Sequence, residues 1–177
     1  MKLTWFGGTT IRIHIGGAIL VVDANRAPKG IDARELVSGA DRVIEQFGAE
    51  LIEVSGREWK PRKPLNLIDE GGVLPEVELW SVGQGSILID AMGETPLLLL
   101  TGEPPVLGRW AEVATTVLFG TGVQIARLGK AVLEDRPPRL LALAADEADV
   151  DHAIPILREL LDGSGLVSLE PGLALEV

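Results

Sequence analysis

The strongest constraint on the fold is a pattern of strand-forming residues that occurs twice in the chain. In the first copy, Ile11, Ile13 and Ile15 alternate with polar residues between two Gly-Gly pairs, and a following apolar run ends at Asp23. Alternation with a period of two is typical of a half-buried strand, and paired glycines favour tight hairpin turns. Residues 3–23 therefore predict an antiparallel meander of three strands.

The second copy begins near Val77 and ends on four consecutive leucines, Leu97 to Leu100. When the copies are superposed, Leu3 corresponds to Leu79, and each final strand is followed by an acidic residue, Asp23 or Glu103. A short apolar run closed by glycine and proline is typical of a strand buried on both faces. The repeat predicts one domain over residues 1–177, with two similar halves at 1–70 and 77–177.

The remaining segments alternate between helical and extended patterns. Apolar residues at helical spacing predict a helix from Asp32 to Phe47, and a strand is expected at 51–54. Later elements are expected, in chain order, as a short helix at 107–114, a strand at 115–119, a helix at 123–134, a strand at 139–144, a helix at 154–161, and edge strands at 167–169 and 173–177. The last helix is expected to start at Ile154 because proline fits the first turn of a helix. These elements favour an α/β (α+β) chain, built as a sheet sandwich covered by helices.

Composition excludes several classes of function. The formal net charge is −10 at pH 7, which argues against a general nucleic-acid binder. The chain has no cysteine, which excludes disulfides, a thiolate nucleophile and cysteine-ligated zinc. The apolar runs are far too short to span a membrane, and the first residues carry no leader pattern. We therefore expect a cytoplasmic protein with no membrane or nucleic-acid partner.

Three acidic residues, Asp23, Glu103 and Asp146, each follow a predicted strand. Such a group of carboxylates could hold Mg²⁺ or act as an acid/base pair. Acidic residues in turns more often cap and brace loops, and that is the interpretation we favour.

Two further segments carry candidate ligand-binding groups. Arg57 and Lys60 belong to a basic, proline-containing segment around Trp59, which could attract an anion or an acidic partner. We favour the simpler interpretation of a solvated loop. The sequence from Gly120 to Gly122 follows a predicted strand and opens a helix, as in a phosphate-binding loop, but Ile125 stands where the third glycine would be. A simple turn is the favoured interpretation there.

Several segments together resemble the metallo-β-lactamase-fold hydrolases, in particular the branch containing the L-ascorbate-6-phosphate lactonase-like proteins. The similar segments are Met1-Lys-Leu-Thr-Trp-Phe-Gly-Gly, Ile11-Arg-Ile-His-Ile-Gly-Gly, Ile19-Leu-Val-Val-Asp23, Thr95 to Pro105, Pro138 to Ala145, and Leu169 to Val177. The resemblance implies a shortened αββα sandwich made of two similar halves.

The metal-binding motif of that family is missing. Its first histidine corresponds to Gly8, its His-x-His-x-Asp-His loop to the histidine-free segment 55–61, and its late histidine to residues 144–146. Its Gly-Asp loop corresponds to Gly102-Glu103. The whole chain has two histidines, His14 and His152, and neither belongs to a paired-ligand spacing. We expect both to be exposed or structural.

These observations predict a metal-free, non-hydrolytic protein without a cofactor, retained for binding a small anion or a protein partner. Asp23, Glu103 and Asp146 would mark the degenerate pocket, and Arg57 and Lys60 an anion site. Two alternatives stay open. One is a small-molecule hydrolase with a metal held by the three acids, and the other is a phosphate or nucleotide binder at Gly120 to Gly122. The apolar segments 113–119 and 173–177 could serve as the edges of a homo-oligomer.

Overall fold

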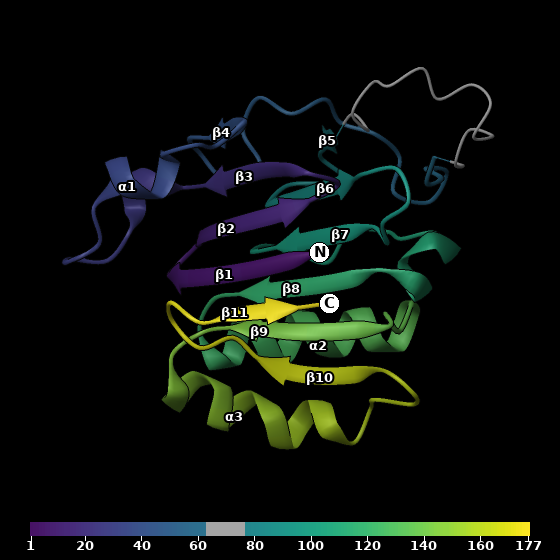
Figure 1. Cartoon of the computed structure of the whole chain (residues 1–177). Helices are drawn as coiled ribbons and strands as arrows, with labels where there is room; N and C mark the ends of the chain where they lie inside the picture. The colour runs from purple at the N-terminus through teal and green to yellow at the C-terminus, as the bar shows by residue number, and fades with distance from the viewer. Residues whose placement is uncertain (63–76) are drawn as a thin grey trace.

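The computed structural model describes residues 1–62 and 77–177, which form two mixed β-sheets with helices on the outside (Figure 1). The first sheet has the order β11-β1-β2-β3-β4, with β1 (Lys2–Gly7), β2 (Thr10–Ile15), β3 (Ala18–Val22), β4 (Arg42–Ile44) and β11 (Ala174–Glu176). The second sheet has the order β10-β9-β8-β7-β6-β5, with β5 (Glu78–Trp80), β6 (Ser86–Asp90), β7 (Leu97–Leu100), β8 (Thr115–Phe119), β9 (Leu140–Ala144) and β10 (Gly165–Ser168). The helices are α1 (Ala33–Val37), α2 (Gly122–Asp135) and α3 (Glu147–Arg158), with 3₁₀ turns η1 (Ala24–Arg26) and η2 (Arg109–Val113).

The two halves begin with the same strand topology. β1, β2 and β3 pair antiparallel in sequence, and β4 then pairs parallel to β3 after a helical crossover. β5, β6 and β7 likewise pair antiparallel, and β8 pairs parallel to β7 after the η2 turn. The repeat seen in the sequence is thus matched by the pairing of four strands in each half.

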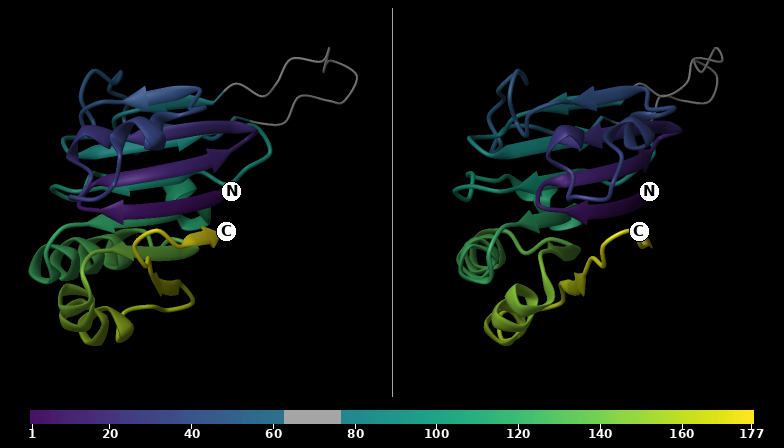
Figure 2. Two further views of the ribbon diagram at one scale, coloured as in Figure 1. Left: turned by 60° about the vertical axis from the view of Figure 1, so that its left-hand side comes forward. Right: turned by 90° about the vertical axis from the view of Figure 1, so that its left-hand side faces the viewer.

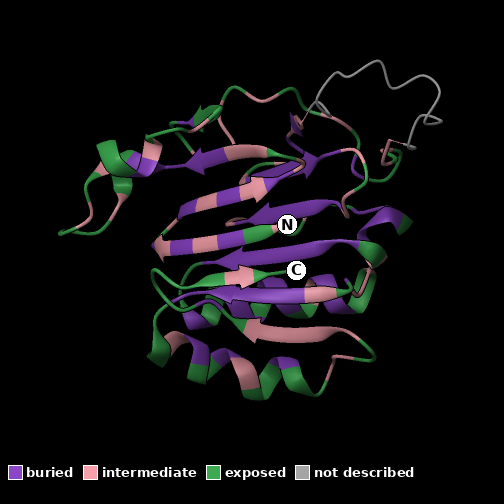
Figure 3. Ribbon diagram, viewed as in Figure 1, coloured by how far each residue is buried: buried purple, intermediate pink, exposed green. Residues whose placement is uncertain are grey.

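The main core lies between the two sheets, which stack face to face (Figure 2). Its largest fully buried members are Trp5 and Phe119, surrounded by the alternating isoleucines of β2 and of β6. A second core fills the outer face of the second sheet beneath α2 and α3. β7 therefore has apolar neighbours on both faces, which explains its uninterrupted leucines and its continuous burial in Figure 3.

The outer face of the first sheet is covered differently. At one end of this face, η1 and α1 pack on the sheet through a small apolar cluster of Val21, Ala24 and Leu36. The rest of the face carries half-buried or exposed side chains such as Thr4 and His14 (Figure 3). The coarse prediction of a mixed α/β chain with two sheets and outer helices is confirmed.

The expected helix from Asp32 to Phe47 is mostly wrong. Asp32 does cap a helix, accepting from Arg34 N at 2.8 Å, but α1 ends after five residues. Ser38 is already extended, Gly39 adopts a left-handed conformation with φ +69°, and the chain then continues into β4. Apolar residues from two different elements had produced the helical spacing. The expected strand at 51–54 is reduced to one bridge, Glu53 to Ser81.

Two further predictions need correction. The helix expected from Ile154 is α3, which begins at Glu147 and contains Pro155 in its interior. Packing of Ala153 and Leu157 in the core beneath α2 offsets the hydrogen bond that proline removes. The segment 113–119 is not a sheet edge, because β8 pairs with β7 on one side and β9 on the other.

Helices in the described residues are all too short or too polar to cross a lipid bilayer.

Candidate functional site

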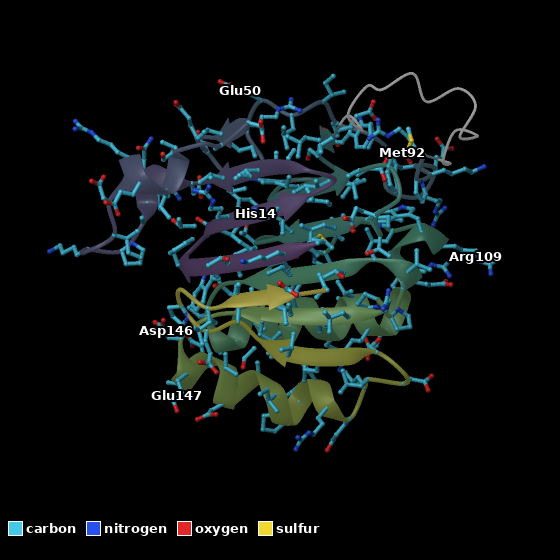
Figure 4. All side chains as sticks on the ribbon, in the orientation of Figure 1. His14, Glu50, Met92, Arg109, Asp146 and Glu147 are labelled. Atoms are coloured by element: carbon cyan, nitrogen blue, oxygen red, sulfur yellow. The ribbon has the colours of Figure 1, made fainter. Side chains whose placement is uncertain are left out.

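A cavity of about 340 Å³ opens where β8 and β9 end. Figure 4 shows Asp146 and Glu147 at this end of the sandwich, with Arg109 at the opposite end. The apolar part of the cavity wall is formed by Trp5, Phe119 and Ala145. The remaining lining residues are polar side chains or glycines: Gly8, Thr9, Thr101, Gly120, Thr121, Gln124, Asp146 and Asp149. The carboxyl ends of parallel strands are the usual place for a ligand site in such sheets.

Asp23 is fully buried and is absent from the cavity lining, although it is bonded to Thr9, which belongs to that lining. Its carboxylate accepts hydrogen bonds from the Thr9 hydroxyl and from Phe47 N at 2.8 Å. Its backbone has φ 51°, a left-handed conformation that aspartate tolerates better than most residues. Its carbonyl accepts from the Thr10 hydroxyl at 2.9 Å. Asp23 therefore braces the β1–β2 turn and the loop after β4.

The other two predicted acids lie apart from it. Glu103 is 75% exposed and forms an ion pair with Arg127, with 2.8 Å between Oε1 and the guanidinium Nη2. Asp146 is exposed and lines the cavity at the N-cap of α3, where its carboxylate makes no capping bond within the described chain. Only Asp146 of the three predicted acids thus lines the cavity.

The backbone at the start of α2 is occupied by groups of the protein itself. Gly122 N donates to Asp149 Oδ1 at 2.7 Å, and Thr121 N donates to Gln124 Oε1 at 2.9 Å. A phosphate at Gly120 to Gly122 would have to displace a carboxylate and an amide oxygen from these N–H groups.

Arg57 and Lys60 are exposed and do not line the cavity. Their segment packs through Trp59, which makes edge-to-face contacts with Trp80 and Trp110 at centroid distances of 5.7 and 4.9 Å. These contacts place the segment on the second core.

The other cation of this segment in the described chain, Arg62, is held firmly. Its Nε donates to Asp90 Oδ2 at 2.9 Å, and its Nη1 lies 3.4 Å from Glu78 Oε1. The fourth member of the basic run, Lys63, lies outside the described residues. The segment up to residue 62 is therefore packed against the body of the protein.

Neither histidine lies in the cavity lining. His14 is half-buried on the outer face of the first sheet (Figure 4), where burial and then the charges of Arg12 and Lys2 lower its pKa. His152 is exposed on α3. Residues 1–62 and 77–177 contain no group of three or more His, Asp or Glu side chains placed to hold a metal ion.

The polar residues that line the cavity include three threonines that the sequence did not single out. Thr9, Thr101 and Thr121 each adjoin a glycine at a turn or strand end. This shared pattern is visible in the sequence, but a threonine beside a glycine is common in turns and does not by itself indicate a binding site.

No protein-family model matches this chain, and no curated protein matches it either.

Proposed function

We propose that this chain is a small-molecule binding protein built on a metallo-β-lactamase-like αββα frame, and that it binds its ligand in the cavity at the ends of β8 and β9 without a metal. The two-sheet stack, the matching strand pairings of the two halves and the helices on the outside support this frame.

One observation carries the proposal. Two positions that the resemblance aligns with family histidines, Gly8 and the segment represented by Asp146, line one cavity together with Thr101, which precedes the Gly102-Glu103 loop. Glu103 itself and the segment 55–61 lie outside this lining. In that lining the positions aligned with histidines hold glycine, alanine and aspartate. This supports a recess at the place where the resemblance puts the family's metal centre, with the imidazoles that bind hydrolytic zinc replaced.

The size and walls of the recess are suited to binding. Its volume lies at the lower end of the range of about 300–1,000 Å³ that is typical of ligand pockets. Buried aromatic rings form part of its wall, and hydroxyl, amide and carboxylate groups surround them. Such a mixture of apolar surface and a few oriented polar groups is typical of sites that hold small polar molecules.

A fragment screen observed by ¹⁵N NMR tests the proposal. Binding fragments are expected to shift the amide resonances of Gly8 and Gly120 first, because both glycines line the cavity. Thr101→Phe, which adds bulk to the lining, should abolish these shifts. Thr4→Phe is the matched control, since Thr4 lies on β1 outside the cavity lining and should leave binding unchanged. Fragments that bind only elsewhere, or binding that survives Thr101→Phe, would refute the proposal.

A further inference from the structure

We infer that the cavity is selective for an organic cation, an ammonium or guanidinium group carrying a short apolar body. This inference depends on the proposed function, because it names the ligand class of the same cavity. It differs from the small anion expected from the sequence, and it follows from where the protons and charges of the lining lie.

Each threonine hydroxyl in the lining already donates its proton to the protein. Thr9 Oγ1 donates to the buried Asp23 carboxylate, and Thr101 Oγ1 donates to Gly85 O at 3.3 Å. Thr121 Oγ1 donates to Gln124 Oε1 at 3.1 Å. A hydroxyl has one proton and two lone pairs, so these three oxygens can offer a ligand only acceptor sites. A ligand that matches them must be a hydrogen-bond donor.

The charges near the cavity have the same sign. Asp146 and Asp149 line it, and the Asp23 carboxylate accepts a hydrogen bond from the lining residue Thr9. Among the described residues, no lysine, arginine or histidine belongs to the lining. The N–H groups at the start of α2, which would otherwise attract an anion, are already bonded to Asp149 and Gln124. Gln124 lines the cavity and is exposed, so its side-chain NH₂ can bind a neutral oxygen of the ligand.

The cavity is suited to an organic cation better than to a metal ion. A hard cation such as Mg²⁺ or Ca²⁺ needs several oxygen ligands at about 2.0–2.6 Å, and carboxylates usually supply them. The described chain has no such group of three acids. The recess also has an apolar wall at Trp5, Phe119 and Ala145, which a bare ion would leave unused and an alkyl chain would cover.

Four probes of similar size test the charge preference: n-butylammonium, n-butylguanidinium, 1-pentanol and pentanoate. We expect either cation to bind about tenfold more tightly than 1-pentanol, because the attraction between a unit charge and a carboxylate near a protein surface is of about that size. Pentanoate should not bind. Raising the salt concentration should weaken the binding of both cations and leave the affinity for 1-pentanol unchanged.

Asp146→Asn removes the exposed charge with almost no change in side-chain size, and it breaks no capping bond because Asp146 makes none within the described chain, so we expect the fold to be preserved. It should weaken cation binding about tenfold and leave 1-pentanol unaffected. Asp162→Asn is the matched control, because it makes the same change of net charge at an exposed residue outside the lining. It should leave all affinities unchanged.

The outcomes separate the inference from the proposed function. Equal or tighter binding of 1-pentanol or pentanoate in the cavity, or full cation affinity in Asp146→Asn, would overturn the inference while the binding role survives. Preferential binding of Mg²⁺ or Zn²⁺ at Gly8 and Gly120, measured with the metals alone, would overturn both. A lack of cavity shifts with all four probes would overturn the inference. The fragment screen then decides the proposed function separately.

Discussion

Replacing Asp23 tests whether this buried acid stabilises the fold or is left over from a catalytic site. Asp23→Ala leaves the Thr9 hydroxyl and Phe47 N without their acceptor. Each lost bond costs about 1 kcal/mol here, at the low end of the usual range because both donors are only partly buried. Placing alanine at φ 51° costs about 1 kcal/mol more. The expected loss in the free energy of unfolding is therefore about 3 kcal/mol.

Asp23→Asn separates geometry from charge. Asparagine tolerates the left-handed backbone and keeps an oxygen for Phe47 N, while the Thr9 hydroxyl can turn to accept from the new NH₂ group. The expected loss is about 1 kcal/mol. Urea unfolding followed by tryptophan fluorescence measures the free energy of unfolding of both variants. Asp162→Ala is the control, because Asp162 is an exposed acid, and its free energy of unfolding should lie within about 0.5 kcal/mol of the parent value. A loss below about 1 kcal/mol for Asp23→Ala, or equal losses for alanine and asparagine, would refute the bracing role.

Three smaller predictions follow from individual side chains. Thr116→Val should raise the free energy of unfolding by about 1 kcal/mol, because the buried Thr116 hydroxyl has no hydrogen-bond partner among the described residues; a destabilised variant in urea unfolding would contradict this. Trp110→Phe should cost about 2 kcal/mol in the same assay, because the indole Nε1–H donates to a buried backbone carbonyl at 2.5 Å; an unchanged midpoint would show that the bond contributes nothing. Burial, Arg12 and Lys2 lower the pKa of His14 from about 6.5, so the unfolded chain takes up a proton before the folded chain does as the pH falls. Stability should fall as the pH drops through 6.5 and level off below the native pKa, and His14→Gln should remove this pH dependence.

The repeated meander was predictable because its signals are local. Alternation along β2 and paired glycines at its two ends fix both the strand and its turns. The four leucines of β7 predicted a strand buried on both faces, and they lie between two cores. These features need no information about distant contacts.

Other elements depended on contacts that the sequence does not show. α1 ends at Val37, and Phe47, predicted as the last helical residue, instead packs edge-to-face on Phe119 at 5.5 Å. Pro155 lies inside α3 because neighbouring residues pack into the core beneath α2. In both places the bounds of the element are set by tertiary packing and differ from those that local sequence preference predicts.

The candidate site was predictable only in part. The sequence placed Asp146 at the end of a strand, and it lines the cavity. Strand ends alone could not show that Asp23 points into a hydrogen-bonded interior or that Glu103 pairs with Arg127 on the surface. Side-chain direction in a turn depends on backbone angles and on partners that are remote in the sequence.

Metal analysis tests the central proposal, binding without a metal, most directly. The chain should be produced in zinc-supplemented medium, purified without chelator, and its metal content measured by mass spectrometry together with its unfolding midpoint before and after chelation. The proposal predicts no stoichiometric zinc, manganese or magnesium and an unchanged midpoint, because the described residues offer no set of ligands for such an ion. A full equivalent of bound metal, with a lower midpoint or a lost hydrolytic activity after chelation, would contradict it.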